Sequence, residues 1–233
     1  MATKLKIVTC YNTHQRFKKP ELGFSPKHVY AIEKMCNQHI TIDYNFYCLT
    51  NDLNLNCQTI PLTDNLFGWW AKMELYKIPG PVLYLDLDTI IIKNIDNILQ
   101  SFINSSKQFN TLWFSNKEAY DSNDLTRIGT GLQFWNSDVS FIYNFYKNIP
   151  YCILHENHTL KKPFHGDQNI LWYILDKVNF NMKEYNPVFA KGKREPIGSF
   201  YGLTLKEIKK YKQILVFHGK RRPWLQDLIP YFI

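Results

Sequence analysis

The sequence predicts a single α/β domain, Rossmann-like, with a mostly parallel central sheet and helices on both faces. The first observation is a β-α-β start, because two extended apolar segments flank an amphipathic helix near the N-terminus. The second is a run of four apolar residues at 82–85 that ends at two acids. The third is the length of 233 residues with 45% apolar and 21% charged residues, which suits one domain with a substantial core.

The N-terminal part of the chain carries clear element signals. Residues 5–10 are a short apolar run and predict a buried first strand. Ser25 and Pro26 predict a helix start, with serine at the N-cap and proline at the first helical position. Residues 41–49 predict a second strand. One face of the helix carries the apolar side chains Val29, Ile32, Met35 and Cys36.

The centre of the chain predicts a short helix followed by a buried strand. The helix covers residues 69–76 and ends at Pro79-Gly80-Pro81. The strand covers residues 82–85, residues 89–92 continue extended, and residues 95–102 form a helix. In open α/β sheets, ligands bind just outside the carboxyl ends of the strands, so a ligand is expected directly after this strand.

The remaining strands are predicted at 111–114, 131–135 and 214–217. The segment 187–202 is basic and punctuated by Gly and Pro, which is typical of either a mobile lid or a plain loop.

Two further helices are expected in this half of the chain. Ser137 is predicted to cap a helix that runs to Lys147. Gly166 and Asp167 open the other helix, whose apolar stripe is Ile170, Leu171, Ile174 and Leu175.

The formal net charge of +8 fits a nucleic acid, an anionic membrane surface or phosphorylated substrates. The basic clusters at 191–194 and 220–222 have no helix-turn-helix, zinc-finger or RNA-recognition signature beside them, so we expect no nucleic-acid partner. No apolar stretch approaches the ~20 residues that span a bilayer, so membrane contact is expected to be at most peripheral. The N-terminal apolar run is too short for a secretory signal, and we expect a cytoplasmic protein.

The cysteines also indicate a reducing compartment. Their number is odd and no C-x-x-C occurs, which argues against a disulfide framework and against a zinc site. We expect reduced thiols at Cys10, Cys36, Cys48, Cys57 and Cys152.

The acidic motif Asp86-Leu87-Asp88 is the first candidate site. Carboxylates are hard oxygen ligands that suit Mg²⁺ or Mn²⁺, and such an ion usually bridges one or two carboxylates and substrate phosphates. Two acids after a strand can also be ordinary loop residues, but their place at a strand end favours a ligand site.

A basic block after the last predicted strand is the second candidate. His218 can ligate Mn²⁺, and Gly219 permits close approach of the backbone to a ligand. Lys220 and Arg222 can carry phosphate charge. A solvated basic turn is the alternative, and the pairing with the acids favours the metal site.

Two weaker patterns remain open. Asp167 is explained either as a helix cap or, with Gln168, as a carboxylate and an amide aimed at a sugar. The glycines at Gly129 and Gly131 suit close backbone approach to a ligand, and they equally suit a plain turn.

These blocks, taken in order, resemble the nucleotide-sugar glycosyltransferases of the GT-A fold, above all glycosyltransferase family eight and its short bacterial and viral relatives. The late H-G-K-x-x-P-W block is fairly specific, and the ordered set spans most of the chain. The matching segments are Trp69-Trp70-Ala71-Lys72, Val82 to Thr89, Gly129-Thr130-Gly131 with Asn136, Asp167-Gln168, and His218 to Trp224.

The resemblance implies a role for each matched residue. The metal, Mn²⁺ or Mg²⁺, is expected on Asp86, Asp88 and His218, and Asp167 and Gln168 are expected to be catalytic. Residues 1–90 would be the nucleotide-binding half and residues 91–233 the sugar and acceptor half of one domain. Donor contacts are expected from Thr9, Tyr11, Asn12, Lys72, Asp86, Leu87, Asp88, Gly131, Gly219, Lys220 and Arg222.

The implied reaction is transfer of a hexose from a nucleoside diphosphate sugar, with uridine diphosphate favoured by the resemblance, to a hydroxyl of a glycan or glycoconjugate. Retention of the anomeric configuration is expected. Two departures matter: Asn169 stands where the family often has a second acid, which leaves the stereochemistry open, and Arg222 replaces the family's lysine.

Two other functions stay open from the sequence. A haloacid-dehalogenase-type phosphohydrolase also places D-x-D after an apolar strand, but it normally has Thr or Val where Ile90 sits, and we find no later acidic pair. A non-catalytic module that binds sugar nucleotides on the same fold is the second alternative.

Overall fold

The computed structural model describes residues 4–14, 23–64, 66, 68–104, 113–114, 130–149, 167–178, 196–199 and 203–217. Among these residues, the main sheet has the strand order β3-β2-β1-β4-β7-β6. The first four of these strands run parallel, whereas β7 pairs antiparallel with β4 and with β6. The bounds are β1 Leu5–Tyr11, β2 Tyr44–Thr50, β3 Thr59–Pro61, β4 Val82–Leu85, β6 Trp113–Phe114 and β7 Leu132–Trp135. The mostly parallel sheet expected from the sequence is confirmed.

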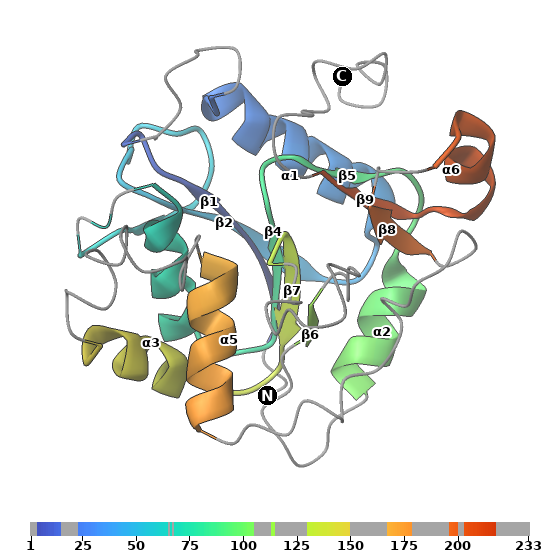
Figure 1. Ribbon diagram of the computed structural model, residues 1–233. Helices are drawn as coiled ribbons and strands as arrows, with labels where there is room; N and C mark the ends of the chain where they lie inside the picture. Colours follow the sequence, from blue (N-terminus) through green and yellow to red (C-terminus); the bar gives the residue numbers. More distant parts are fainter. Residues whose placement is uncertain are drawn as a thin grey trace.

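Helices cover both faces of this sheet, as predicted (Figure 1). Alternating strand residues supply two cores: Ile7 and Leu83 face one side, and Val8 and Tyr84 face the other. On the first side lie α1 (Pro26–His39) and α2 (Asp96–Asn104), and on the second lie η2 (Gly68–Lys77), α3 (Ser140–Lys147) and α5 (Asp167–Lys177). The predicted stripe of α5 is buried in the second core, namely Ile170, Leu171, Ile174 and Leu175.

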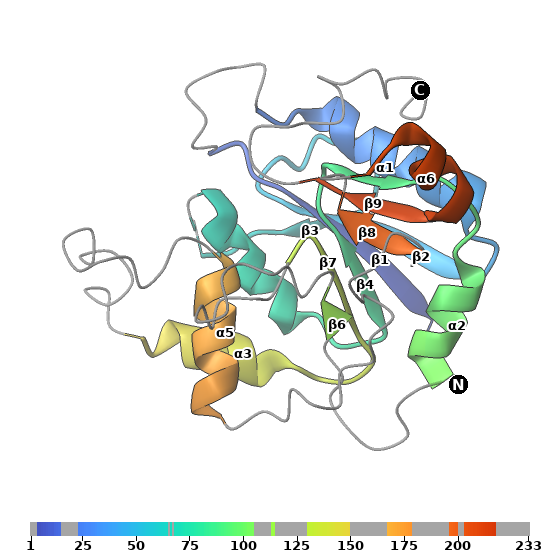
Figure 2. The ribbon, with the colours of Figure 1, turned by 45° about the vertical axis from the view of Figure 1, so that its right-hand side comes forward.

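A second, small sheet was not expected from the sequence. It consists of β5 (Thr89–Ile91), β9 (Ile214–Val216) and β8 (Ile197–Ser199), in the order β5-β9-β8, with α6 (Leu205–Tyr211) beside it (Figure 2). The chain leaves β4, turns at residues 87–88 and enters this sheet. The extended conformation predicted for 89–92 is therefore correct, but it belongs to a different sheet.

Residues 197–199 correct the prediction of a lid or loop over 187–202. They form β8, which pairs in parallel with β9, and the main-chain N–H groups of Gln213 and Ile214 both donate to Pro196 O. Ile197 is buried at 3% exposure, so one side chain of this segment faces the core. A strand of three residues is too short to show an alternating pattern in the sequence, which is why it was not predicted. The other residues of 187–202 lie outside the described parts of the chain.

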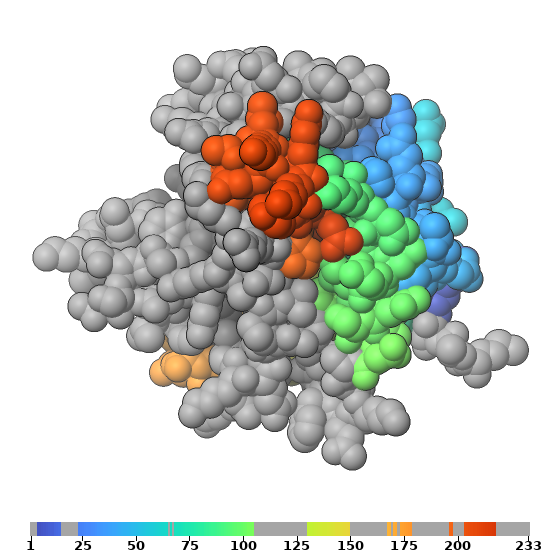
Figure 3. All heavy atoms as spheres, turned by 90° about the vertical axis from the view of Figure 1, so that its right-hand side faces the viewer, coloured from blue at the N-terminus to red at the C-terminus, as the bar shows by residue number. Residues whose placement is uncertain are grey.

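Polar contacts join the small sheet and α6 to the segment between β5 and α2. Gln213 Nε2 donates to Asn94 O, and Lys93 Nζ donates to Lys210 O over 3.3 Å. Figure 3 shows the residues of α6, in red, next to those of α2, in green, on one face of the molecule. Thr204 and Glu207 form a capping box at the start of α6.

Two predicted boundaries are wrong for local reasons. The second strand begins at Tyr44 instead of residue 41, because the Asp96 carboxylate accepts hydrogen bonds from the N–H and hydroxyl of Thr41. Ser137 does not cap α3, which begins at Ser140 after a bond from its N–H to Asp138 Oδ1. The helix predicted at 69–76 is present as the 3₁₀ helix η2.

Ser137 contacts the backbone at Gly80 instead of capping α3. Its carbonyl accepts a hydrogen bond from Gly80 N over 3.0 Å. A Cβ on Gly80 would lie 2.5 Å from Ser137 N and 2.4 Å from Asn136 C, so only glycine fits against this stretch of backbone.

Several other expectations are met within the described residues. The α1 helix starts after the N-cap Ser25 with Pro26 in its first turn, and its predicted apolar face is buried. No helix in the described parts is long and apolar enough to cross a membrane. The described cysteines are free, namely Cys10, Cys36, Cys48 and Cys57, and Cys152 lies outside these parts.

Candidate active site

Asp86 lies where the main sheet passes the chain to the small sheet. Its N–H donates to Gly131 O over 2.8 Å, and its carbonyl accepts from Thr89 N over 2.9 Å, which closes the turn through Leu87 and Asp88. The Asp86 side chain is 21% exposed, whereas Asp88 is buried at 3%. Leu87 packs in the first core, so its backbone would make any contact between this residue and a sugar donor.

Lys72 joins two carboxylates that are far apart in the sequence. Its Nζ lies 2.7 Å from Oδ1 and 3.0 Å from Oδ2 of Asp86, and 3.3 Å from Oδ2 of Asp167. Burial by itself would lower the pKa of Lys72, but the charges of Asp167 and Asp86 outweigh that effect and raise it. The lysine is therefore a fixed positive charge, held between both acids by η2.

Two hydroxyl groups orient these acids. The Tyr84 hydroxyl donates to Asp86 Oδ1, and the Thr130 hydroxyl donates to Asp167 Oδ2 over 2.6 Å. Burial and the nearby Asp86 charge raise the pKa of Tyr84 well above its usual value, so the phenol stays protonated and remains a donor. The sequence interpretation missed both residues, because Tyr84 reads as a strand core residue and Thr130 as part of a glycine turn.

Gly131 brings β9 close to Asp86. A Cβ on Gly131 would lie 2.6 Å from Val216 Cγ1 and 3.5 Å from Asp86 Oδ2. The missing side chain thus lets the start of β7 contact β9 just before the predicted basic block. That block, with His218, Gly219, Lys220 and Arg222, lies outside the described residues.

The carboxyl end of β1 lies beside β4. Thr9 is fully buried, and its hydroxyl donates to Leu85 O over 2.8 Å. Asn12 Nδ2 donates to Leu66 O over 2.7 Å, and its Oδ1 accepts from His14 N. Tyr11 is 7% exposed. The donor contacts expected from these residues stay predictions.

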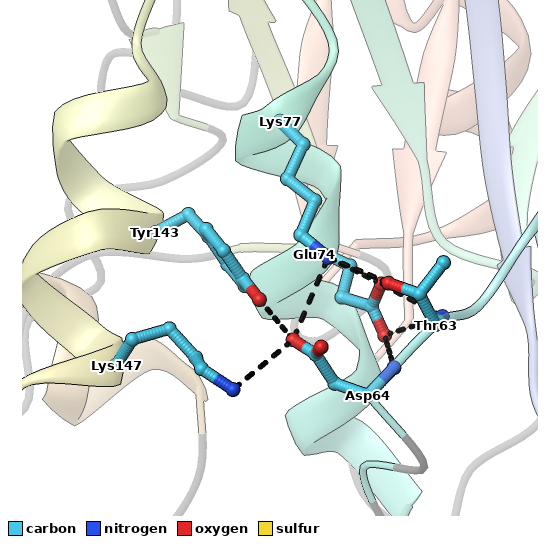
Figure 4. Close-up of polar contacts among 6 residues, drawn as sticks. All are labelled: Thr63, Asp64, Glu74, Lys77, Tyr143 and Lys147. Carbon is cyan, nitrogen blue, oxygen red and sulfur yellow. Dashed lines mark hydrogen bonds and ion pairs between the residues drawn. The ribbon is translucent and has the colours of Figure 1, made fainter.

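A polar cluster fastens η2 and hence Lys72 (Figure 4). The buried Glu74 carboxylate accepts from Thr63 N, from Asp64 N and, over 2.8 Å, from Lys77 Nζ. Asp64 accepts from the Tyr143 hydroxyl of α3. Burial alone would raise the pKa of Glu74, but these hydrogen bonds outweigh it and lower the pKa. Nothing in the sequence pattern marked this cluster.

The structure therefore brings together Lys72, Asp86 and Asp167, three residues that the sequence interpretation singled out. Gln168 is half-buried next to Asp167 at the start of α5. Among the described residues, no group of three or more His, Cys, Asp or Glu that could hold a metal is present. The metal set that includes His218 stays a prediction.

No protein-family model matches this chain, and no curated protein sequence matches it. Solved structures of glycosyltransferases are similar to it. The apo form of GlyE from Streptococcus pneumoniae has 12% identity and a TM-score of 0.56 over 95% of this chain and 56% of GlyE. The galactosyltransferase LgtC, in complex with donor and acceptor sugar analogues, has 11% identity and a TM-score of 0.53 over 96% and 91%.

A glycosyltransferase involved in glycosylation of the major capsid of PBCV-1 has 15% identity and a TM-score of 0.53, covering 95% of this chain and 96% of that one. This chain spans little more than half the length of GlyE, whereas it spans nearly all of the other two. At these identities the likeness concerns the fold. This chain has the GT-A fold of these glycosyltransferases.

Proposed function

We propose that this chain is a metal-dependent glycosyltransferase. It moves a hexose from a nucleoside diphosphate sugar, in our proposal a uridine diphosphate sugar, to a hydroxyl of a glycan or glycoconjugate, with retention at the anomeric carbon. The observation that carries the proposal is the Asp86–Lys72–Asp167 constellation at the carboxyl end of β4 in a GT-A fold. The complex of LgtC with donor and acceptor sugar analogues supports two such partners.

The acidic turn fits a divalent metal by its chemistry. Asp86 and Asp88 offer hard carboxylate oxygens, and Mg²⁺ or Mn²⁺ binds through one or two carboxylates together with substrate phosphates. His218 would add a third ligand from the segment after β9. A bound metal would act as a Lewis acid that neutralises charge on the departing diphosphate.

The chain's own residues have distinct tasks in this proposal. Lys72 keeps positive charge beside Asp86, and Lys220 with Arg222 would bind the diphosphate. Asp167, with Gln168 beside it, faces the sugar carbon, where positive charge develops in an oxocarbenium-like transition state. A carboxylate held in place before the reaction stabilises that charge without reorganising.

The test measures release of free nucleotide from a panel of nucleotide sugars with Mn²⁺ present. We expect Asp86→Asn to lower turnover by a factor on the order of 10² or more. Asp43→Asn is the matched control, because Asp43 is 83% exposed and pairs only with Lys4 among its described contacts. Unchanged turnover in Asp86→Asn would refute the assignment.

The same assay separates the alternatives. A phosphohydrolase would release phosphate from phosphate esters and leave nucleotide sugars intact. A binding module would be stabilised by a donor in thermal unfolding yet release no nucleotide.

A further inference from the structure

We infer that Thr130 is a positioning residue for Asp167, and that Gln133 and Tyr76 hold Thr130 in turn. This inference rests on the proposed function, because it assigns Thr130 a role in aiming a carboxylate that acts on the donor sugar. Sequence reasoning explained the glycines around Thr130 as either a close backbone approach to a ligand or a plain turn, and it gave Thr130 itself no role.

A continuous chain of hydrogen bonds carries the inference. The Tyr76 hydroxyl donates to Gln133 Oε1 over 2.7 Å, and Gln133 Nε2 donates to Thr130 O over 3.0 Å. The Thr130 hydroxyl then donates to Asp167 Oδ2 over 2.6 Å. These bonds thus connect η2, through Gln133 of β7 and Thr130 two residues before β7, to the first residue of α5.

Burial makes the loss of any of these bonds costly. Tyr76, Gln133 and Thr130 are exposed by 2%, 1% and 1%, so water cannot replace a lost partner. The Thr130 carbonyl can only accept, so it turns the Gln133 Nε2 toward Thr130 and leaves Oε1 for the Tyr76 hydroxyl. In surroundings of low dielectric, hydrogen bonds in such a network are stronger than in water.

Two partners of Asp167 have different effects: the Thr130 hydroxyl orients its carboxylate, and Lys72 balances its charge. Among the described residues, Thr130 and Lys72 both bind Oδ2 of Asp167, and no hydrogen bond or ion pair reaches Oδ1. Lys72 supplies charge to Asp167 from 3.3 Å, but it also serves both oxygens of Asp86. Of the two partners found in the described parts of the chain, the Thr130 hydroxyl is the nearer at 2.6 Å, so it sets the direction in which Oδ1 faces.

Loss of this hydroxyl should therefore affect catalysis more than donor binding. A misplacement of about 1 Å in a catalytic group can cost on the order of 10²-fold in rate. The diphosphate and the metal would be held by other residues, so donor affinity has no reason to fall.

The test compares Thr130→Val, which keeps the shape without the hydroxyl, with Thr130→Ser, which keeps the hydroxyl. We expect Thr130→Val to lower kcat by a factor on the order of 10 to 10², with the donor KM within about threefold, and Thr130→Ser to retain most activity. Thr50→Val is the control, because Thr50 is also fully buried and its hydroxyl accepts from Asp52 N, away from Asp167. Tyr76→Phe leaves Thr130 intact and should give a smaller fall in kcat. This variant tests the inference if Thr130→Val does not fold.

Crystal structures of the same variants give a readout that needs no turnover. We expect the Asp167 carboxylate to turn away from its wild-type orientation in Thr130→Val and to keep it in Thr130→Ser. An unchanged orientation in Thr130→Val, or equal kcat values for the Val and Ser variants, overturns the inference. If the wild-type protein turns over no donor, the proposed function fails, and the crystallographic comparison alone decides the positioning role.

Discussion

Gly131→Ala should destabilise the protein through one defined clash. The added Cβ would lie 2.6 Å from Val216 Cγ1, whereas carbon atoms normally meet at about 3.5–4.0 Å. Val216 is buried at 2% exposure, and it is held in β9 between β5 and β8. Its branched side chain has little rotamer freedom. Such overpacking typically costs about 1–3 kcal/mol of the free energy of unfolding.

The structure also predicts which second change relieves the clash. Val216→Ala removes the clashing methyl and leaves Val216 Cβ at 4.0 Å from the new carbon, which is an ordinary contact. By itself Val216→Ala should cost about 1–3 kcal/mol through lost burial. In the double variant the two costs should not add, and the coupling should be about 1–3 kcal/mol.

Urea unfolding of the four proteins measures this cycle, with the slope m as the check that only stability changes. Strict additivity of the two single variants would refute the reasoning, because it would mean that the methyl group added to Gly131 never contacts Val216. A double variant that is as stable as Val216→Ala alone would support it most directly.

Three more predictions concern charge. Lys72→Met removes the shared cation from two partly buried carboxylates and should lower the free energy of unfolding in urea by about 3–5 kcal/mol. The control Lys4→Met breaks an exposed pair with Asp43 and should lower it by at most about 1 kcal/mol. Equal losses in the two variants would contradict the prediction. The pKa of Glu74 is lowered in the folded state, so the ionised carboxylate stabilises the fold above the unfolded pKa, and this stabilisation is lost as pH falls through the folded pKa. The difference in free energy of unfolding between wild type and Glu74→Gln should therefore shrink from pH 7 to pH 3. A difference that stays constant over this range would argue against the prediction. EDTA should abolish the thermal stabilisation by a nucleotide sugar and Mn²⁺ should restore it, and stabilisation that survives EDTA would count against the metal.

Strong local signals explain the parts of the fold that were predictable. The four-residue strand β4 was predicted with its observed bounds, and Ser25 with Pro26 marked the start of α1. Both signals depend only on residues that are neighbours in the sequence, so the sequence pattern is enough to predict these two elements. The place of Asp86 at a strand end followed from the same reasoning.

The small sheet could not be predicted in the same way. Its strands, β5, β8 and β9, are three residues each, too short to show a period. The strand at 214–217 was expected, but nothing nearby identified β5 as its partner.

The contacts of the site depend on side-chain reach across the fold. Lys72 was singled out as a donor contact, yet its approach to Asp86 and Asp167 requires η2, β4 and α5 to be in place. Thr130 and Tyr84 carry no distinctive pattern, because a hydroxyl that orients a carboxylate looks like any other buried hydroxyl in the sequence.

The pairing of β5 with β9 also affects how the protein is made. Contacts across this junction join residues such as Asn94 and Gln213, which are 119 positions apart. At the usual ~5–20 residues per second, a ribosome needs on the order of ten seconds to make that interval. During this time β1, β2 and β4 can already pair, while β5 presents an open edge of the kind that invites aggregation. Synthesis of β9 therefore both protects this edge and completes the support of the acidic turn.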